Sequence, residues 1–391
     1  MTELLFRRDP YATMFEATVT EVRGHDVLLD RTLFYPEAGG QSADEGVLRS
    51  VSGEARVVDV RKDGEVVWHT VEGIVPSAGN VVTGELDWPV RYRHMQRHTG
   101  EHLLAQAFLR VNDAFRVEAV SMRSPTCTID LRGDPTFEDA RAAEAILREV
   151  AAKDWRVEAF EVPSGELSAF PLRRPPKVSG LVRLVGVRDA DGGWWEMSAC
   201  GGTHLKSTAF ASPIVVLGLE RVKGGLTRVS FMAGDEATEY LGRVYQDAKS
   251  VAQKLSVPVE KLVERFEATL QDAASTKQEL ERARSSWGET LAAGSERLGH
   301  ARFVRVPDVA LVVHVLKAFL DEPSAVGIVL SPEGRCGVAS TRQDVHAGKT
   351  LQALLEASGG RGGGKPDVAQ GQTASLDTFE DAARSFASTL V

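Results

Sequence analysis

Apolar and polar positions change their pattern several times along the chain. Residues 12–90 hold short runs of strand-forming residues, such as Ala17–Thr20 and Val27–Leu29, which are separated by glycines and show no helical period. Such runs between turn residues are typical of β-strands. We therefore expect a small N-terminal β-barrel domain over residues 1–90.

A helical period begins near Arg91. Leu103, Leu104, Ala107 and Phe108 recur at helical spacing, a second helix is expected from Glu138 to Ala152, and more strand-like runs follow. This mixture predicts an α+β domain over residues 91–235.

Residues 236–300 have few glycines and carry an apolar stripe at three- and four-residue spacing. The spacing predicts a helical hairpin or short coiled coil that acts as a spacer, with Ser256 as the cap of a second helix before Pro258. The stripe consists of Ala273, Thr276, Leu280, Ala283, Trp287 and Leu291.

The last part of the chain, residues 301–391, alternates apolar runs with helical stretches. Val309–Val313 and Val326–Leu330 are the clearest of these runs. The pattern predicts a C-terminal α/β domain, so the overall fold class is α+β with four parts.

Composition excludes several classes of protein. No apolar run is long enough to span a bilayer, and the N-terminus lacks a signal-peptide layout, so we expect a cytoplasmic protein. Three scattered cysteines argue against a disulfide framework. The net charge of −9 gives no general attraction for nucleic acid, but local patches decide phosphate contacts.

Two distant pairs of residues form a candidate metal site. His98 and His102 lie four apart on the first expected helix, so both imidazoles point to one face. Cys200 and His204 follow an expected hairpin with a turn at residues 191–193, and the glycines between them allow a sharp bend. Three imidazoles and one thiolate suit Zn²⁺ better than a hard cation. The sequence therefore predicts one zinc ion per chain, with a catalytic and a structural role both open.

Three motifs in this order resemble one protein family. They are FYPEAGGQ at residues 34–41, followed by Asp44 and Gly46, HTGEHLL at residues 98–104, and CGGTH at residues 200–204. Together they resemble the AlaX editing proteins related to alanyl-tRNA synthetase, in their long form. The family usually has glycine where Ala38 stands and proline where Ser42 stands. Residues 359–371, GGRGGGKPDVAQG, resemble the signature of the domain that follows DHH phosphoesterase modules and closes alanyl-tRNA synthetases.

The resemblance implies hydrolysis of the ester between a wrong amino acid, serine and in some cases glycine, and the 3′-terminal adenosine of alanine tRNA. No part of the sequence before the expected barrel resembles an aminoacylation domain. We therefore expect a trans-editing hydrolase whose partner is mischarged alanine tRNA, with a homodimer through the spacer or the C-terminal domain as a further expectation.

Three residues are candidates for the chemistry of ester hydrolysis. Glu101 is a candidate general base, but on a helix it points away from the face shared by His98 and His102, which favours a solvated carboxylate or a partner of a ligand. Gln41 either contacts substrate or closes its loop. The Thr203 hydroxyl either distinguishes serine or satisfies local backbone.

The remaining candidates would contact substrate or RNA. Backbone amides near the paired glycines at residues 39–40 and 201–202 are candidates for binding substrate oxygens. Candidate RNA contacts are Arg361 and Lys365 in the terminal glycine-rich segment, and Arg91, Arg93 and Arg97 beside the metal helix. A flexible surface loop and a solvated helix start are the alternatives. Cys127 and Cys336 are interpreted as structural.

Two other functions are compatible with the sequence. His98, Glu101 and His102 match an HxxEH metalloprotease pattern, which predicts an open coordination position. The chain also fits a noncatalytic zinc-containing protein that binds RNA or forms oligomers.

Overall fold

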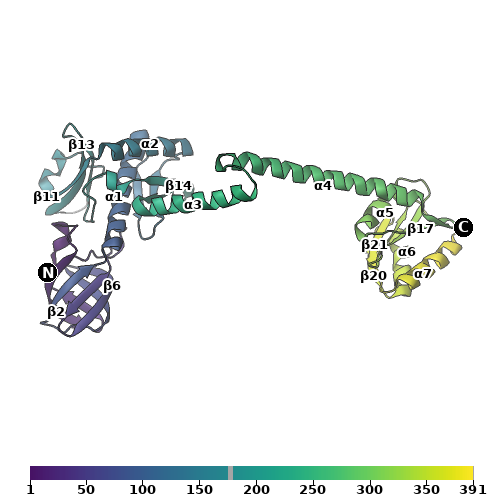
Figure 1. Ribbon diagram of the computed structural model, residues 1–391, viewed down its shortest axis with the longest axis horizontal. Helices are drawn as coiled ribbons and strands as arrows, with labels where there is room; N and C mark the ends of the chain where they lie inside the picture. The colour runs from purple at the N-terminus through teal and green to yellow at the C-terminus, as the bar shows by residue number, and fades with distance from the viewer. Residues whose placement is uncertain (175–178, 391) are drawn as a thin grey trace. The chain divides into compact units, whose positions relative to one another are not determined.

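The computed structural model describes residues 1–174 and 179–390. The chain forms two compact units, Met1–Ala248 and Lys249–Val391, which are drawn in Figure 1.

A closed six-stranded barrel forms the first part of the N-terminal unit, as the sequence predicts. Inward and outward side chains alternate along its strands, so that Phe15, Ala17 and Val19 of one strand fill the interior. In barrel order the strands are β2 (Met14–Arg23), β3 (Asp26–Leu29), β7 (Val66–Gly73), β6 (Gly53–Asp63), β5 (Gly46–Ser50) and β8 (Val81–Leu86). A short parallel pair, β1 (Glu3–Leu4) and β4 (Arg31–Thr32), and the 3₁₀ turn η1 (Leu5–Arg7) accompany the barrel.

Helix α1 (Trp88–Val111) follows the barrel directly. Asp87 caps its first turn by accepting a hydrogen bond from the Val90 amide at 3.3 Å, and Pro89 occupies a position where no amide donor is needed. Most of the helix is buried, including many of its polar residues. A Cβ added at Gly100 would lie 2.6 Å from the Ala233 Cβ, so the helix and the sheet behind it approach closely.

Two antiparallel sheets complete the N-terminal unit. The larger has the order β14 (Ile214–Val222), β15 (Leu226–Ala233), β10 (Cys127–Arg132) and β9 (Val117–Ser121). The smaller consists of β11 (Arg156–Pro163), β12 (Leu181–Arg188) and β13 (Trp194–Ala199). Helix α2 (Phe137–Lys153) confirms the second expected helix, and Thr136 and Asp139 form a capping box at its start. The 3₁₀ turns η2 (Ser164–Ala169) and η3 (Ala209–Ala211) lie in the connections, and α3 (Gly234–Lys254) follows β15.

The C-terminal unit is a mixed six-stranded sheet with helices. Its strand order is β16 (Glu296–Leu298), β17 (Ala301–Arg305), β18 (Val326–Leu330), β19 (Arg335–Ser340), β21 (Val368–Gln372) and β20 (Arg361–Gly364), and only β17 and β18 pair in parallel. The helices are η4 (Val259–Lys261), α4 (Leu262–Ala293), η5 (Val309–Leu311), α5 (Val312–Leu320), α6 (Ala347–Ser358) and α7 (Leu376–Thr389).

The structure corrects three local expectations. The apolar run Val309–Val313 is a 3₁₀ turn that leads into α5, so it belongs to a helix and not to a strand. Ser256 does not cap a helix, because its φ is +55° and the next turn begins after Pro258. The glycine-rich segment at residues 361–364 is the edge strand β20 and not an irregular loop.

Two helices, α3 and α4, cover most of the expected spacer at residues 236–300. The boundaries at residues 90, 235 and 300 stay predictions. Among the described residues, no helix is both long and apolar enough to cross a membrane.

Candidate metal centre and its cavity

The structure brings the four predicted metal ligands together. His98 and His102 lie on α1, Cys200 directly follows β13, and His204 lies four residues later. One ligand atom from each residue lies within 4.8 Å of the others. The Cys200 Sγ is 3.3 Å from Nε2 of His98 and 3.3 Å from Nε2 of His204.

Glycine at residue 202 is required for this convergence. A Cβ at Gly202 would lie 2.1 Å from Cε1 and 2.4 Å from Nδ1 of His98. A Cβ at the neighbouring Gly201 would meet nothing within 4 Å. The turn between Cys200 and His204 therefore presses its backbone against the His98 ring at one position only.

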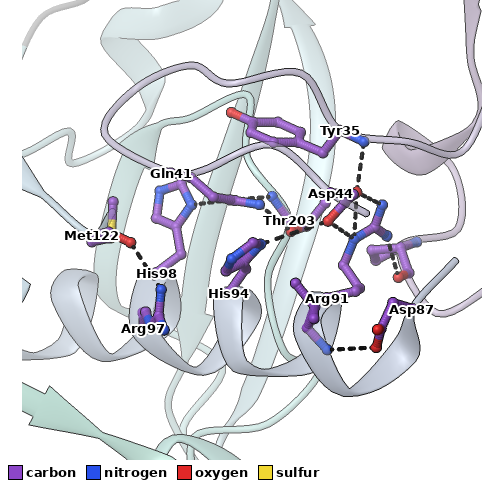
Figure 2. Close-up of polar contacts among 12 residues, drawn as sticks. Tyr35, Gln41, Asp44, Asp87, Arg91, His94, Arg97, His98, Met122 and Thr203 are labelled. Carbon is purple, nitrogen blue, oxygen red and sulfur yellow. Dashed lines mark hydrogen bonds and ion pairs between the residues drawn. The ribbon is translucent and has the colours of Figure 1, made fainter. Parts of the chain in front are cut away.

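Each imidazole has a partner at the nitrogen that faces away from the cluster. Nδ1 of His98 lies 2.7 Å from Oε1 of Gln41, as Figure 2 shows. Nδ1 of His102 lies 3.4 Å from Oε2 of Glu196, and Nδ1 of His204 lies 3.3 Å from the Thr99 hydroxyl. Such contacts orient the rings and leave the Nε2 atoms for a metal ion.

The charge states of Cys200 and His204 suit a soft divalent metal ion, whereas an ion that binds His102 would have to displace a proton. Burial alone would raise the pKa of the Cys200 thiol, but the neighbouring imidazoles, His98 first, lower it well below its usual range. Burial lowers the pKa of His204 to about 3. For His102 burial acts in the same direction, but the charge of Glu196 raises the pKa to about 10. A thiolate beside imidazole nitrogens is the donor set that zinc favours, so these residues fit the predicted ion.

Gln41 is held in place by the turn that begins at Ala38. The backbone amide of Gln41 donates to the Ala38 carbonyl at 3.0 Å, and the Met122 amide donates to the Gly40 carbonyl at 2.8 Å. Gly40 has a φ of +85°, whereas Ala38 lies outside the left-handed region and needs no glycine. The Gln41 amide donates to the Thr203 hydroxyl at 2.9 Å, so Gln41 joins the barrel loop to the metal-binding turn.

Arg91 lies in the interior and not on an RNA-binding surface. Its side chain is fully buried and forms an ion pair with Asp44, and it also donates to the Leu33 carbonyl at 2.6 Å and the Pro10 carbonyl at 2.9 Å. Burial alone would raise the pKa of Asp44, but the charge of Arg91 lowers it. Figure 2 shows this pair near the start of α1. The expected RNA contact at Arg91 is replaced by a salt bridge that ties α1 to the barrel.

Arg97 and Arg93 also do not form the basic surface that the sequence predicts. Arg97 is buried and binds Glu236 with Nε at 2.6 Å and Nη2 at 2.5 Å from the two carboxylate oxygens. Arg93 is exposed and lies 2.8 Å from Glu239. Both arginines pair with the start of α3, so only Arg93 is accessible to a ligand.

A cavity of about 900 Å³ opens beside the four candidate metal ligands. His98, His102 and Cys200 line it, together with Gly39 and Glu101. Glu101 is buried, which excludes the solvated carboxylate, and its Oε2 lies 3.8 Å from Nε2 of His102.

The other candidate groups lie behind the cavity wall or in the other unit. Gln41 and Thr203 are buried and reach the cavity only through His98. The Gly202 amide lies 3.4 Å from the Cys200 sulfur, to which it donates, so it is not free to bind a substrate oxygen. Arg361 and Lys365 are exposed at and after the edge strand β20, in the C-terminal unit.

Cys127 and Cys336 are buried, as expected for structural cysteines. Burial raises the pKa of Cys127 to about 12 and that of Cys336 to about 11, so both stay protonated thiols at neutral pH.

The structure adds two residues that the sequence did not single out, Glu196 and Arg173. Glu196 bridges His102 and Arg173, with its Oε1 at 3.0 Å from Nε of Arg173. The sequence signal that could have identified Glu196 is the alternation of side chains along strand β13. Glu196, Ser198 and Cys200 are two residues apart and therefore share one face.

Three family models match separate parts of the chain. The model for tRNA synthetases class II (A) matches residues 8–90, which hold the barrel with Gln41 and Asp44. The model for the threonyl and alanyl tRNA synthetase second additional domain matches residues 182–230, which hold Cys200 and His204. The DHHA1 domain model matches residues 306–391 in the C-terminal unit.

Individual relatives match almost the whole chain. Alanine–tRNA ligase from Pyrococcus abyssi is 30% identical over 98% of this chain and 43% of its own length. The ligases from Ignicoccus hospitalis and Pyrobaculum neutrophilum are 32% and 34% identical, over 93% and 98% of this chain and 40% and 44% of their own lengths. The chain thus spans less than half of these relatives. Together with the three family models, these matches show that the chain is related to alanyl-tRNA synthetase, with a second additional domain and a DHHA1 domain.

Proposed function

We propose that this chain is a trans-editing hydrolase that removes a wrong amino acid, serine first and glycine second, from alanine tRNA. The observation that carries this proposal is the cluster of His98, His102, Cys200 and His204 at the wall of a cavity, in a chain related to alanyl-tRNA synthetase. In this proposal the cavity takes the aminoacylated 3′ end, and the four residues hold one Zn²⁺.

Ester hydrolysis needs a base for the attacking water, because water is a poor nucleophile at neutral pH. Glu101 is the carboxylate that lines the cavity next to His102. We assign it to accept a proton from water as the water oxygen bonds to the ester carbonyl carbon. The same carboxyl group then returns the proton to the ribose oxygen when the ester bond breaks, which leaves a free amino acid and a free 3′ end.

A bound zinc ion would supply positive charge to polarise or orient the substrate. Gln41, Glu196 and Thr99 act on the reaction through the rings that they orient. Thr203 is a positioning residue in this scheme, since its hydroxyl accepts a hydrogen bond from Gln41 and is fully buried.

The test is deacylation of free alanine tRNA by the purified chain. We expect the serine ester to be lost much faster than the alanine ester, and we expect Glu101→Gln to slow this loss by about 100- to 10,000-fold, the range for general acid–base catalysis. Circular dichroism and zinc content of the variant provide the control for folding. Equal, slow loss of both esters, with RNA still bound, would favour the noncatalytic RNA-binding protein.

A further inference from the structure

The cavity beside the metal-binding residues has an unusual charge for this chain. Four arginines and two glutamates line it, although the chain as a whole carries a charge of −9. The arginines are Arg116, Arg132, Arg173 and Arg174. A positively charged wall in an acidic protein indicates a ligand that brings negative charge.

Arg173 is partly buried, whereas the other three arginines of the cavity are exposed. Its side chain is 17% exposed, and its Nε donates to the Ser198 hydroxyl at 2.9 Å and lies 3.0 Å from Oε1 of Glu196. Arg132 is 65% exposed and pairs with Glu118 at the surface. Within residues 1–174 and 179–390, the two terminal nitrogens of Arg173 make no hydrogen bond. These two nitrogens are therefore available to a ligand in the cavity.

Glu196 connects this arginine rigidly to the metal-binding residues. The Glu196 carboxylate is fully buried, with one oxygen facing Arg173 and the Ser198 hydroxyl at 2.5 Å and the other oxygen facing His102. An arginine held in this way loses little side-chain entropy when it binds. The position of Arg173 relative to His102 is therefore set by the Glu196 carboxylate.

The chemistry of the proposed substrate identifies the anion. An amino acid in ester linkage has no free carboxylate and carries an ammonium group, so the negative charges of an aminoacyl-tRNA are its phosphodiesters. The planar guanidinium of arginine offers paired donors that match phosphate oxygens.

Resting on the proposed function, we propose that Arg173 binds a phosphodiester near the 3′ end of the RNA. It thereby fixes the position of the ester relative to the metal-binding residues. The site takes an RNA strand and recognises its backbone and not its bases.

The first test is the salt dependence of binding of uncharged alanine tRNA to the full chain. For a single strand, each phosphate contact contributes about 0.7 to the slope of log K against log salt concentration, so Arg173→Gln is expected to lower the slope by about 0.7. Arg173→Lys keeps the charge and is expected to keep the slope while binding more weakly. Arg221→Gln is the matched control, because Arg221 is an exposed arginine that pairs with Asp134 and does not line the cavity. An unchanged slope for Arg173→Gln overturns the proposal.

The second test separates this contact from a structural role and from the proposed function. Arg173→Gln is expected to raise KM for seryl-tRNA about 10- to 100-fold more than KM for 3′-O-seryl-adenosine, as for loss of a charge-assisted hydrogen bond to phosphate. The adenosine ester has no phosphate, so a loss common to both substrates reports the support that Arg173 gives to Glu196. An equal loss on both esters, or loss of zinc, shows that Arg173 only supports Glu196 and overturns the proposal. Failure of the unsubstituted chain to cleave either ester contradicts the proposed function, whereas the salt slope still decides the phosphate contact.

Discussion

Helix α1 carries two buried polar clusters that differ in how their hydrogen bonds are used. At its start, Arg91 is surrounded by acceptors, namely Asp44 and two backbone carbonyls. Two turns later, His98 and His102 each place one nitrogen against a partner and direct the other towards Cys200 and His204. Arg91, Asp44, His98, His102 and His204 are all buried and only Cys200 is partly exposed, so burial alone hardly distinguishes the two clusters.

This difference indicates that the first cluster stabilises the fold and that the second can bind a ligand. A buried charge must be paired, and Asp44 and Arg91 pair each other within the chain. At the second cluster the partners of the imidazoles hold the rings so that their remaining lone pairs converge. Convergent lone pairs without a donor between them create a place for a cation. The first cluster is complete with protein atoms, whereas we expect the second to be completed by a metal ion.

The largest expected effect is the loss of metal from the second cluster. Cys200→Ala removes the only thiolate of the four ligands. A structural zinc site contributes on the order of 10 kcal/mol of binding free energy, and Cys200→Ala removes the one anionic donor of this site and opens its coordination. We expect zinc content, measured by elemental analysis after dialysis, to fall from about one ion per chain to nearly none.

Cys336→Ala is the matched control, because it also removes a buried thiol but lies in the other unit. We expect its zinc content to stay unchanged. If Cys200→Ala retained its zinc, the metal would be held by α1 in the manner of an HxxEH protease, and the contrast between the two clusters would be wrong.

The next effect breaks the first cluster. Arg91→Met leaves the Asp44 carboxylate buried without its partner, which costs about 3–5 kcal/mol of unfolding free energy. Hydrogen exchange under increasing urea would measure this loss in the barrel amides separately from those of the C-terminal unit. The C-terminal amides provide the internal reference.

The double variant Arg91→Met with Asp44→Asn tests the reason for that loss. Asparagine keeps an acceptor for the Tyr35 amide, which lies 2.6 Å from Asp44, and removes the unpaired charge. We expect the double variant to be more stable than Arg91→Met alone. A lower stability for the double variant would mean that Asp44 contributes mainly through hydrogen bonds and not through its charge.

The two clusters also explain what could be predicted from the sequence. The cluster of candidate metal ligands was predictable, because cysteine and histidine at these spacings are typical of metal-binding residues. The pairing of Arg91 with Asp44 and of Arg97 with Glu236 was not, since the partners lie 47 and 139 residues away and an arginine alone looks like a surface charge. The barrel and α1 follow from local periodicity, whereas the apolar run Val309–Val313 is too short for its period to separate a helix from a strand.

His69 is a third buried polar group. As in the cluster of Arg91 and Asp44, its polar atoms have partners within the protein. In the barrel its Nδ1 lies 3.1 Å from the Val27 carbonyl and its Nε2 lies 2.8 Å from the Thr32 hydroxyl. Burial lowers the pKa of His69 to about 4 from 6.5. Between these values the unfolded chain binds a proton that the folded chain does not, so unfolding free energy falls by about 3 kcal/mol as pH drops from 6.5 to 4.

We expect His69→Gln to lose this part of the pH dependence in unfolding measurements between pH 7 and pH 4, while His25→Gln, at an exposed histidine, keeps it. An unchanged slope for His69→Gln would show that other groups control acid stability.

The smallest expected effect concerns Gln41, whose own polar atoms have protein partners and which also contacts His98 of the second cluster. Its carbonyl oxygen orients His98, and its amide group donates to Thr203. Removal of a partner that orients a metal ligand typically costs 10- to 100-fold in metal affinity, or about 1.4–2.7 kcal/mol. We expect this loss for Gln41→Ala in a chelator competition. Gln41→Glu keeps an oxygen for Nδ1 of His98, loses the donor to Thr203 and adds a carboxylate charge beside the ring, so its metal affinity should be at least that of the unsubstituted chain. Equal affinity losses in both variants would mean that the bond to Thr203, and not the orientation of His98, determines how the barrel loop supports the metal.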